Sequence, residues 1–146
     1  FWLCEDSVET VVIYEMTEKE ALERREYCLG LADSKGLLDY EKLNEARMID
    51  KNNITICPFC LEPLSAQGFF SRLAQAMGRE VHDLTITELN LFHIQEIRYG
   101  VYNHRTYNLG WGHHHCNVVV KDSGIQDTLL WMHNIVEKNI SLGFLP

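Results

Sequence analysis

The chain has 146 residues, 46% hydrophobic and 23% charged, which is the composition of an ordinary domain with one core of modest size. It contains no apolar run near the roughly 20 residues that a membrane helix needs and no signal-peptide pattern, so we expect a cytoplasmic protein without a membrane segment. The net charge of −8 argues against a large nucleic-acid surface.

The negative charge is concentrated in the first third of the chain. Residues 1–50 hold six Lys and Arg against thirteen Asp and Glu, whereas residues 51–146 hold seven against eight. The second region is therefore close to neutral, which allows a small contact with nucleic acid. Because the chain opens on Phe1, we expect a fragment or a processed product of a larger parent chain.

Residues 1–50 are expected to form an acidic, mainly helical segment that serves as a scaffold or docking element. Val8 to Met16 is rich in β-branched residues and predicts a short strand. Thr17 followed by Glu20 is a capping-box pattern, which predicts a helix that ends near Gly30. The apolar spacing from Leu37 to Ile49 predicts a second helix.

Residues 51–146 are expected to form a second domain, because Lys51–Asn53 interrupts the pattern. Ile54 to Cys60 predicts a short strand that enters a turn, and a helix is expected from Ser65 to Met77. Val81 to Ile97 is expected to be extended.

The rest of the chain is expected to be a loop followed by a helix. Gly100 to Gly112 is rich in Tyr, Asn and Gly and predicts a loop, with regular structure resuming at Cys116. Gln126 to Lys138 predicts a closing helix with an inward-facing apolar side made of Leu129, Leu130, Trp131, Ile135 and Val136.

A zinc site is predicted from two pairs of ligands with the same spacing. Cys57 and Cys60 are separated by two residues, and so are His113 and Cys116. Two such pairs supply the four ligands of a tetrahedral structural zinc site from two tight turns. Five cysteines without an export signal also favour a metal site in a reducing compartment over a disulfide framework.

Two alternatives to this ligand set remain open. His115 could replace His113 as the histidine ligand, and Cys57 with Cys60 could instead be a thiol redox pair. No βαβ pattern follows the two cysteines, which disfavours the redox interpretation. Cys4 and Cys28 lie outside any pair and are expected to be buried thiols.

Three short motifs lie between the two ligand pairs and at the second one. They are Leu91-Phe92-His93-Ile94, Tyr107-Asn108-Leu109 and His113-His114-His115-Cys116-Asn117. Their order resembles the HNH, or ββα-metal, nucleases whose fold is pinned by a two-knuckle zinc site, over residues 56–121. The resemblance implies an α+β fold with a zinc-pinned ββα-metal core.

The resemblance also implies residue roles for phosphodiester hydrolysis. His93 would be the general base, Asn108 would brace the loop beside it, and Asn117 would bind a catalytic Mg²⁺ or Mn²⁺. The family usually has an aspartate or histidine immediately before the base. Phe92 occupies that position here, so the missing ligand would be Glu96 or, as a weaker candidate, Asn90. DNA contacts are expected from His104, Arg105 and Lys121.

We therefore expect a divalent-metal-dependent endonuclease that acts on double-stranded DNA, of the restriction or host-defence kind and able to act as a homodimer. Homing and phage nucleases share the same resemblance. Phe92 and the net acidity favour the alternative, a non-catalytic zinc-stabilised module that binds DNA or docks to a protein.

Overall fold

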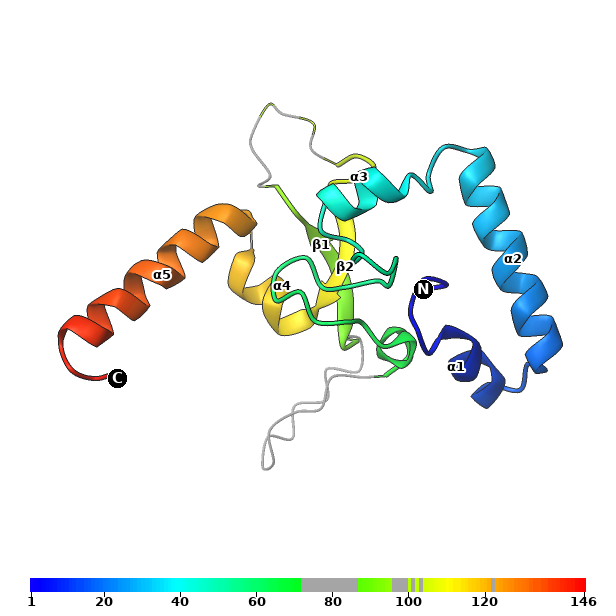
Figure 1. Ribbon diagram of the computed structural model, residues 1–146, viewed down its shortest axis with the longest axis horizontal. Coiled ribbons are helices and arrows are strands. Elements are labelled where there is room, and N and C mark those ends of the chain that lie inside the picture. Colours follow the sequence, from blue (N-terminus) through cyan, green and yellow to red (C-terminus); the bar gives the residue numbers. More distant parts are fainter. Residues whose placement is uncertain (72–86, 96–99, 101, 103, 122) are drawn as a thin grey trace.

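We obtained a computed structural model that describes residues 1–71, 87–95, 100, 102, 104–121 and 123–146. The described residues form five α-helices, one 3-10 helix and one antiparallel sheet of two strands (Figure 1). The expected α+β class is therefore confirmed. The sheet lies in the middle of the molecule, with α1 and α2 to one side of it and α4 and α5 to the other.

The N-terminal segment is helical from its start. Helix α1 covers Ser7–Ile13, so the strand predicted for residues 8–16 is wrong. The carboxylate of Asp6, the residue before α1, accepts hydrogen bonds from the Ser65 hydroxyl at 2.6 Å and the Ala66 N–H at 2.7 Å. Long-range contacts of this kind fix the local backbone and override the weak strand preference of β-branched residues.

Helix α2 begins where its capping box predicted. It covers Glu18–Ser34, and Thr17 and Glu20 exchange both hydrogen bonds of the box. The helix continues past Gly30, and its C-terminal turn is completed by Gly36, whose φ is +67°. The glycine that ends the helix was therefore misplaced by six positions.

Helix α3 is shorter than expected. It covers Tyr40–Glu45, with the Asp39 side chain accepting from the Lys42 N–H, in place of the predicted residues 37–49. The chain leaves the helix because Arg47 adopts a φ of +59°, after which Met48 and Ile49 are buried. Ile49 then forms an isolated bridge with Thr55, across a turn at the predicted domain boundary.

The sheet lies in the region of the candidate site and joins two segments that are separated along the chain. Strand β1 covers Leu89–His93 and strand β2 covers Leu109–His113. They pair antiparallel with Leu89 opposite His113 and His93 opposite Leu109. The predicted extended region is confirmed in its described part, whereas the loop predicted for residues 100–112 is wrong from Leu109 onward.

The core lies between the sheet, helix α4 and the segment before the sheet. Helix α4, His114–Val120, follows β2 directly and packs against both strands. Ahead of the sheet, a 3-10 helix η1, Ala66–Phe69, contacts α1 and β1. A helix was predicted for residues 65–77; Phe70 and Ser71 are not helical, and residues 72–77 lie outside the described residues. The buried cluster consists of Cys4, Cys57, Leu64, Ala66, Leu89, Phe92, Cys116, Val120 and Ile125.

The last helix extends away from this core. Helix α5 covers Ile125–Ser141, which confirms the predicted helix, but among the described elements it contacts only α4. Figure 1 shows it pointing outward from the sheet. The prediction that its apolar side faces inward is wrong, since Leu130 is 56% and Trp131 59% exposed, and Leu129, Ile135 and Val136 are exposed too. No helix in the described part of the chain is long and apolar enough to span a membrane.

Candidate metal centre and active site

The four predicted zinc ligands lie together in space. One ligand atom from each of Cys57, Cys60, His113 and Cys116 falls within 4.8 Å of all the others, and this is the one such cluster in the part of the chain that the structure describes. The Cys60 Sγ is 3.3 Å from the His113 Nδ1. Three sulfur donors and one imidazole nitrogen form a set that could hold a metal such as zinc.

A tight turn holds one half of the cluster, and the junction of a strand with a helix holds the other. Cys57 donates its N–H to the Glu62 carbonyl, and its own carbonyl accepts from the Leu61 N–H, which closes the first turn. His113 is the last residue of β2 and the N-cap of α4, and Cys116 lies in the first turn of that helix. Sheet, helix and turn therefore meet at the cluster.

The alternative histidine also lies beside the cluster. The His115 Nε2 is 3.4 Å from the Cys116 Sγ, and its ring stacks on that of His113 with the centroids 5.9 Å apart. His115 is exposed, whereas His113 is half-buried and belongs to the four-atom set. His114 points elsewhere, and its Nδ1 contacts the Asn90 Oδ1.

Burial and mutual proximity shift the pKa values of three of the four cluster side chains. Burial raises the pKa of the Cys116 thiol, and the nearby Cys57 and Cys60 raise it further. Burial likewise raises the pKa of the Cys60 thiol. Burial and the neighbouring His115 lower the pKa of His113. A bound divalent cation would reverse the penalty on the thiolates.

Gly112 lies where the metal ligands meet the core, and its lack of a side chain leaves room for both. A Cβ at this position would lie 2.9 Å from the Phe92 Cδ2 and 3.2 Å from the Cys57 Sγ. Phe92 is fully buried there. Its side chain is therefore committed to packing, and it has no atom that coordinates a cation.

His93 stands at the end of β1 with a second imidazole beside it. The His93 Nε2 is 3.4 Å from the His104 Nδ1, and the ring centroids are 5.5 Å apart. His93 is half-buried, and His104 is exposed. The structure thus places His104, expected as a DNA contact and as the next candidate for the base, directly against His93.

Asn108 clamps the loop that follows His93. Its side chain is 2% exposed, and its Oδ1 accepts from the Gln95 N–H at 2.8 Å. Its carbonyl accepts from the Ile94 N–H at 3.1 Å. Both bonds fix the two residues after His93, and with them the end of the strand that carries the imidazole.

The other expected site residues surround this clamp. The Asn117 Nδ2 donates to the Leu91 carbonyl at 3.1 Å, which ties α4 to β1 two residues before His93. The Arg105 guanidinium donates to the Gln95 Oε1 at 3.2 Å. Lys121 is exposed just after α4, at a φ of +46°. Glu96 lies outside the described residues.

Sequence reasoning missed the packing role of Gly112 and the position of Arg47. A glycine on each side of Trp111 in what proves to be a strand was the available signal for the first, since glycine in a strand often marks a close approach of another group. Arg47 had no comparable signal, because it lies in a segment separated from the site along the chain.

Fold and site together describe a small α+β protein with a metal-binding cluster beside a histidine and asparagine site. The model of the BstXI restriction endonuclease family matches residues 1–114, so the chain belongs to this family. The match includes the acidic N-terminal segment, both strands and His93, and it ends before Cys116 and Asn117. No curated protein and no solved structure matched the chain. Membership of this family implies an endonuclease that acts on DNA in a restriction system.

Proposed function

We propose that the chain cleaves double-stranded DNA by the HNH chemistry, with a zinc-pinned ββα core and a catalytic divalent cation. The observation that carries the proposal is the clamp of Asn108 on the loop after His93. A buried amide that fixes the residues beside a half-buried imidazole is what a positioned general base requires. The order of β1, β2 and α4 supports the same assignment.

In the proposed reaction, His93 accepts a proton from the attacking water. The His104 Nδ1 lies 3.4 Å from the His93 Nε2, so one ring can donate a hydrogen bond to the other and orient it. A neutral His93 is the form that takes a proton. Asn108 holds the loop and positions the base without touching the substrate.

The cation would be Mg²⁺ or Mn²⁺, and it would stabilise negative charge on the phosphate and the leaving oxygen. Asn117 is the first proposed ligand. Its amide nitrogen is used by Leu91, which leaves the amide oxygen for a cation. Glu96 is proposed as the second ligand. Its place in the chain, three residues after His93, and the packing of Phe92 are the grounds for this choice.

The protein as a whole is proposed to act on duplex DNA as a restriction or defence nuclease, with residues 1–50 as a docking segment and residues 51–146 as the nuclease domain. His104, Arg105 and Lys121 are proposed DNA contacts around His93. A homodimer would place one such site on each strand of the DNA duplex.

A second candidate function is a zinc-stabilised DNA-binding or docking module without catalysis. The burial of Phe92 favours it, because the usual acidic ligand is missing. The two candidates differ in whether a second cation binds. Calorimetric titration of the zinc-loaded protein with Mn²⁺ should show one additional site in the proposed nuclease. The site should weaken at least tenfold in Asn117→Ala, a loss on the order of 1.4 kcal/mol. Absence of any Mn²⁺ binding would favour the non-catalytic module.

A further inference from the structure

Arg47 is held in a backbone conformation that arginine rarely adopts. Its φ is +59°, in the left-handed region that few residues other than glycine enter. Its N–H donates to the Asn44 carbonyl, and the next residue, Met48, is buried beneath Gly110. Such a conformation persists where the surroundings impose it, and it is often found at functional sites.

The side chain of Arg47 has no partner among the described residues. No hydrogen bond or ion pair joins its guanidinium to another described group, although the residue is half-buried. The other arginine near the site is engaged, since Arg105 donates to Gln95. A partly buried cation without a partner is costly unless an anion joins it.

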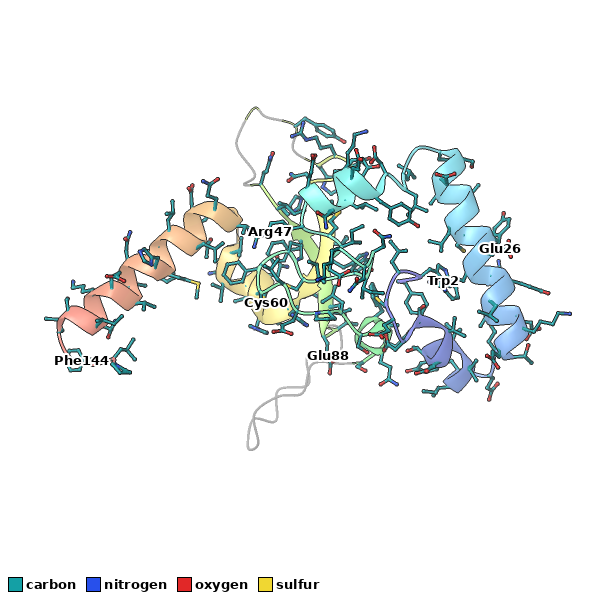
Figure 2. All side chains as sticks on the ribbon, in the orientation of Figure 1. Trp2, Glu26, Arg47, Cys60, Glu88 and Phe144 are labelled. Atoms are coloured by element: carbon teal, nitrogen blue, oxygen red, sulfur yellow. The ribbon has the colours of Figure 1, made fainter. Side chains whose placement is uncertain are left out.

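Arg47 lines a groove that begins at the loop after His93. The groove has a volume of about 440 Å³, and its walls are Arg47, Ile94, Gln95, Ile125, Gln126, Leu129 and Leu130. Ile94 and Gln95 directly follow His93, and the Ile94 carbonyl accepts from the Ile125 N–H. Figure 2 shows Arg47 between α3 and the start of α5.

The lining of the groove suits one nucleotide of a DNA strand. The isoleucine and leucine side chains offer an apolar wall for the deoxyribose, and two glutamine amides offer donors and acceptors. A guanidinium can bind two oxygens of one phosphate at once. The groove therefore combines an unpaired cation with a wall that the sugar can contact.

We propose that Arg47 binds a backbone phosphate of the DNA strand in this groove, next to the phosphate that is cut at His93. The inference rests on the proposed nuclease function and adds a substrate-binding residue to it. It also gives the acidic N-terminal segment a part in DNA binding, because Arg47 lies two residues after the end of α3 and lines the groove. The acidic helix α2 lies on the other side of the sheet (Figure 1).

The test is the binding of a short fluorescein-labelled duplex, measured by anisotropy in EDTA over a series of salt concentrations. Arg47→Ala should weaken binding about tenfold at low salt and reduce the slope of log K against log salt by about one. Arg47→Lys keeps the charge and should keep the slope. It should lose less affinity than Arg47→Ala, and the loss arises because lysine cannot bind two phosphate oxygens at once as a guanidinium does. Arg24, exposed on α2, provides the control variant Arg24→Ala, which should bind as the parent does.

Arg47→Gln removes the charge but keeps most of the aliphatic stem and a polar end, so it replaces Arg47→Ala if alanine lowers the melting temperature. Parent-like affinity and salt slope in the neutral Arg47 variants, with a parent that binds and cuts DNA, would overturn the inference alone. A parent protein that neither binds nor cuts DNA would overturn the proposed function, and the inference with it.

Discussion

Phe92 and Gly112 determine what the end of β1 can do. The phenyl ring fills the space between the sheet and the cysteine turn, and Gly112 on the neighbouring strand leaves room for both the ring and the Cys57 sulfur. An acid at position 92 would be buried against apolar groups and thiolates, where its charge would be strongly disfavoured. A cation near His93 must therefore take its ligands from elsewhere.

Replacing Gly112 by alanine tests this packing. The new methyl group would meet the Phe92 ring at 2.9 Å and the Cys57 Sγ at 3.2 Å, so one of them must move. We expect a loss of about 1 to 3 kcal/mol in the free energy of unfolding, as for overpacked cores. The bound zinc per chain should fall as well, measured by atomic emission after dialysis.

Gly30→Ala is the matched control. Gly30 lies inside α2 with nothing within 4 Å of an added Cβ, so alanine there should raise stability by about 0.5 to 1 kcal/mol and leave the zinc content unchanged. A Gly112→Ala variant that is as stable as the parent and binds as much zinc would contradict the close packing of Phe92 and Cys57 against Gly112.

At the scale of elements, Asp6 fastens the N-terminal helices to the core. Partial burial alone would raise the pKa of its carboxyl, but the hydrogen bonds from Ala66 and Ser65 lower the pKa below its usual value. A carboxyl with a lowered folded-state pKa stabilises the fold above its unfolded-state pKa. This stabilisation is lost as the pH falls through the lower, folded-state value.

Asp6→Ala should therefore destabilise the chain by about 1.5 to 3 kcal/mol at neutral pH, the usual range for hydrogen bonds to a charged group. The loss relative to the parent should shrink in acid, once the parent carboxyl is protonated. Urea unfolding at neutral and acidic pH measures both effects. Glu5→Ala, one residue earlier and exposed, is the control. An equal loss at both pH values would contradict the role given to the charge.

The elements show which features local sequence can predict. The capping box of Thr17 predicted the start of α2, and the periodicity of residues 126–138 predicted α5. Local preference failed where distant contacts decide, as in α1, whose start is tied to residues some 60 positions away. The exposed side of α5 could not be predicted either, since periodicity shows that a helix has an apolar side but not what covers it.

The part of the candidate site that could be predicted is the part whose residues are regularly spaced along the sequence. The two pairs of ligands in the metal cluster share a two-residue gap, which predicted the cluster. The second pair lies at the junction of β2 and α4 and not in a tight turn as expected. The bracing role of Asn108 was expected only from the resemblance, and the atoms that it holds, like the pair of His93 with His104, depend on the pairing of β1 with β2. The position of Arg47 beside the groove depends on how the N-terminal segment packs against the remainder of the chain. No local sequence pattern predicts that packing.

For the whole molecule, metal binding should decide whether the second half of the chain is folded. The cluster joins the cysteine turn, β2 and α4, and a structural zinc site contributes on the order of 10 kcal/mol, similar to the whole stability of a small domain. Cys60→Ala should therefore abolish zinc binding and the cooperative thermal transition of the parent, followed by circular dichroism.

Cys28→Ala removes a thiol outside the cluster and should leave zinc stoichiometry at one per chain. A chelator should reproduce the effect of Cys60→Ala on the parent protein. An unchanged melting temperature in Cys60→Ala, or a parent that folds equally well without metal, would contradict a structural zinc site.

We propose that His93 serves as the general base of a metal-dependent DNA nuclease. The most direct test of this proposal is the cleavage of supercoiled plasmid by the zinc-loaded protein with Mg²⁺ or Mn²⁺, beside an EDTA control and a His93→Ala variant of equal zinc content and melting temperature. The account predicts nicked or linear product only with the cation and only with His93 present, and a rate reduced at least 100-fold in the variant. Cleavage that persists in His93→Ala, or no cleavage by the folded parent with either cation, would contradict it.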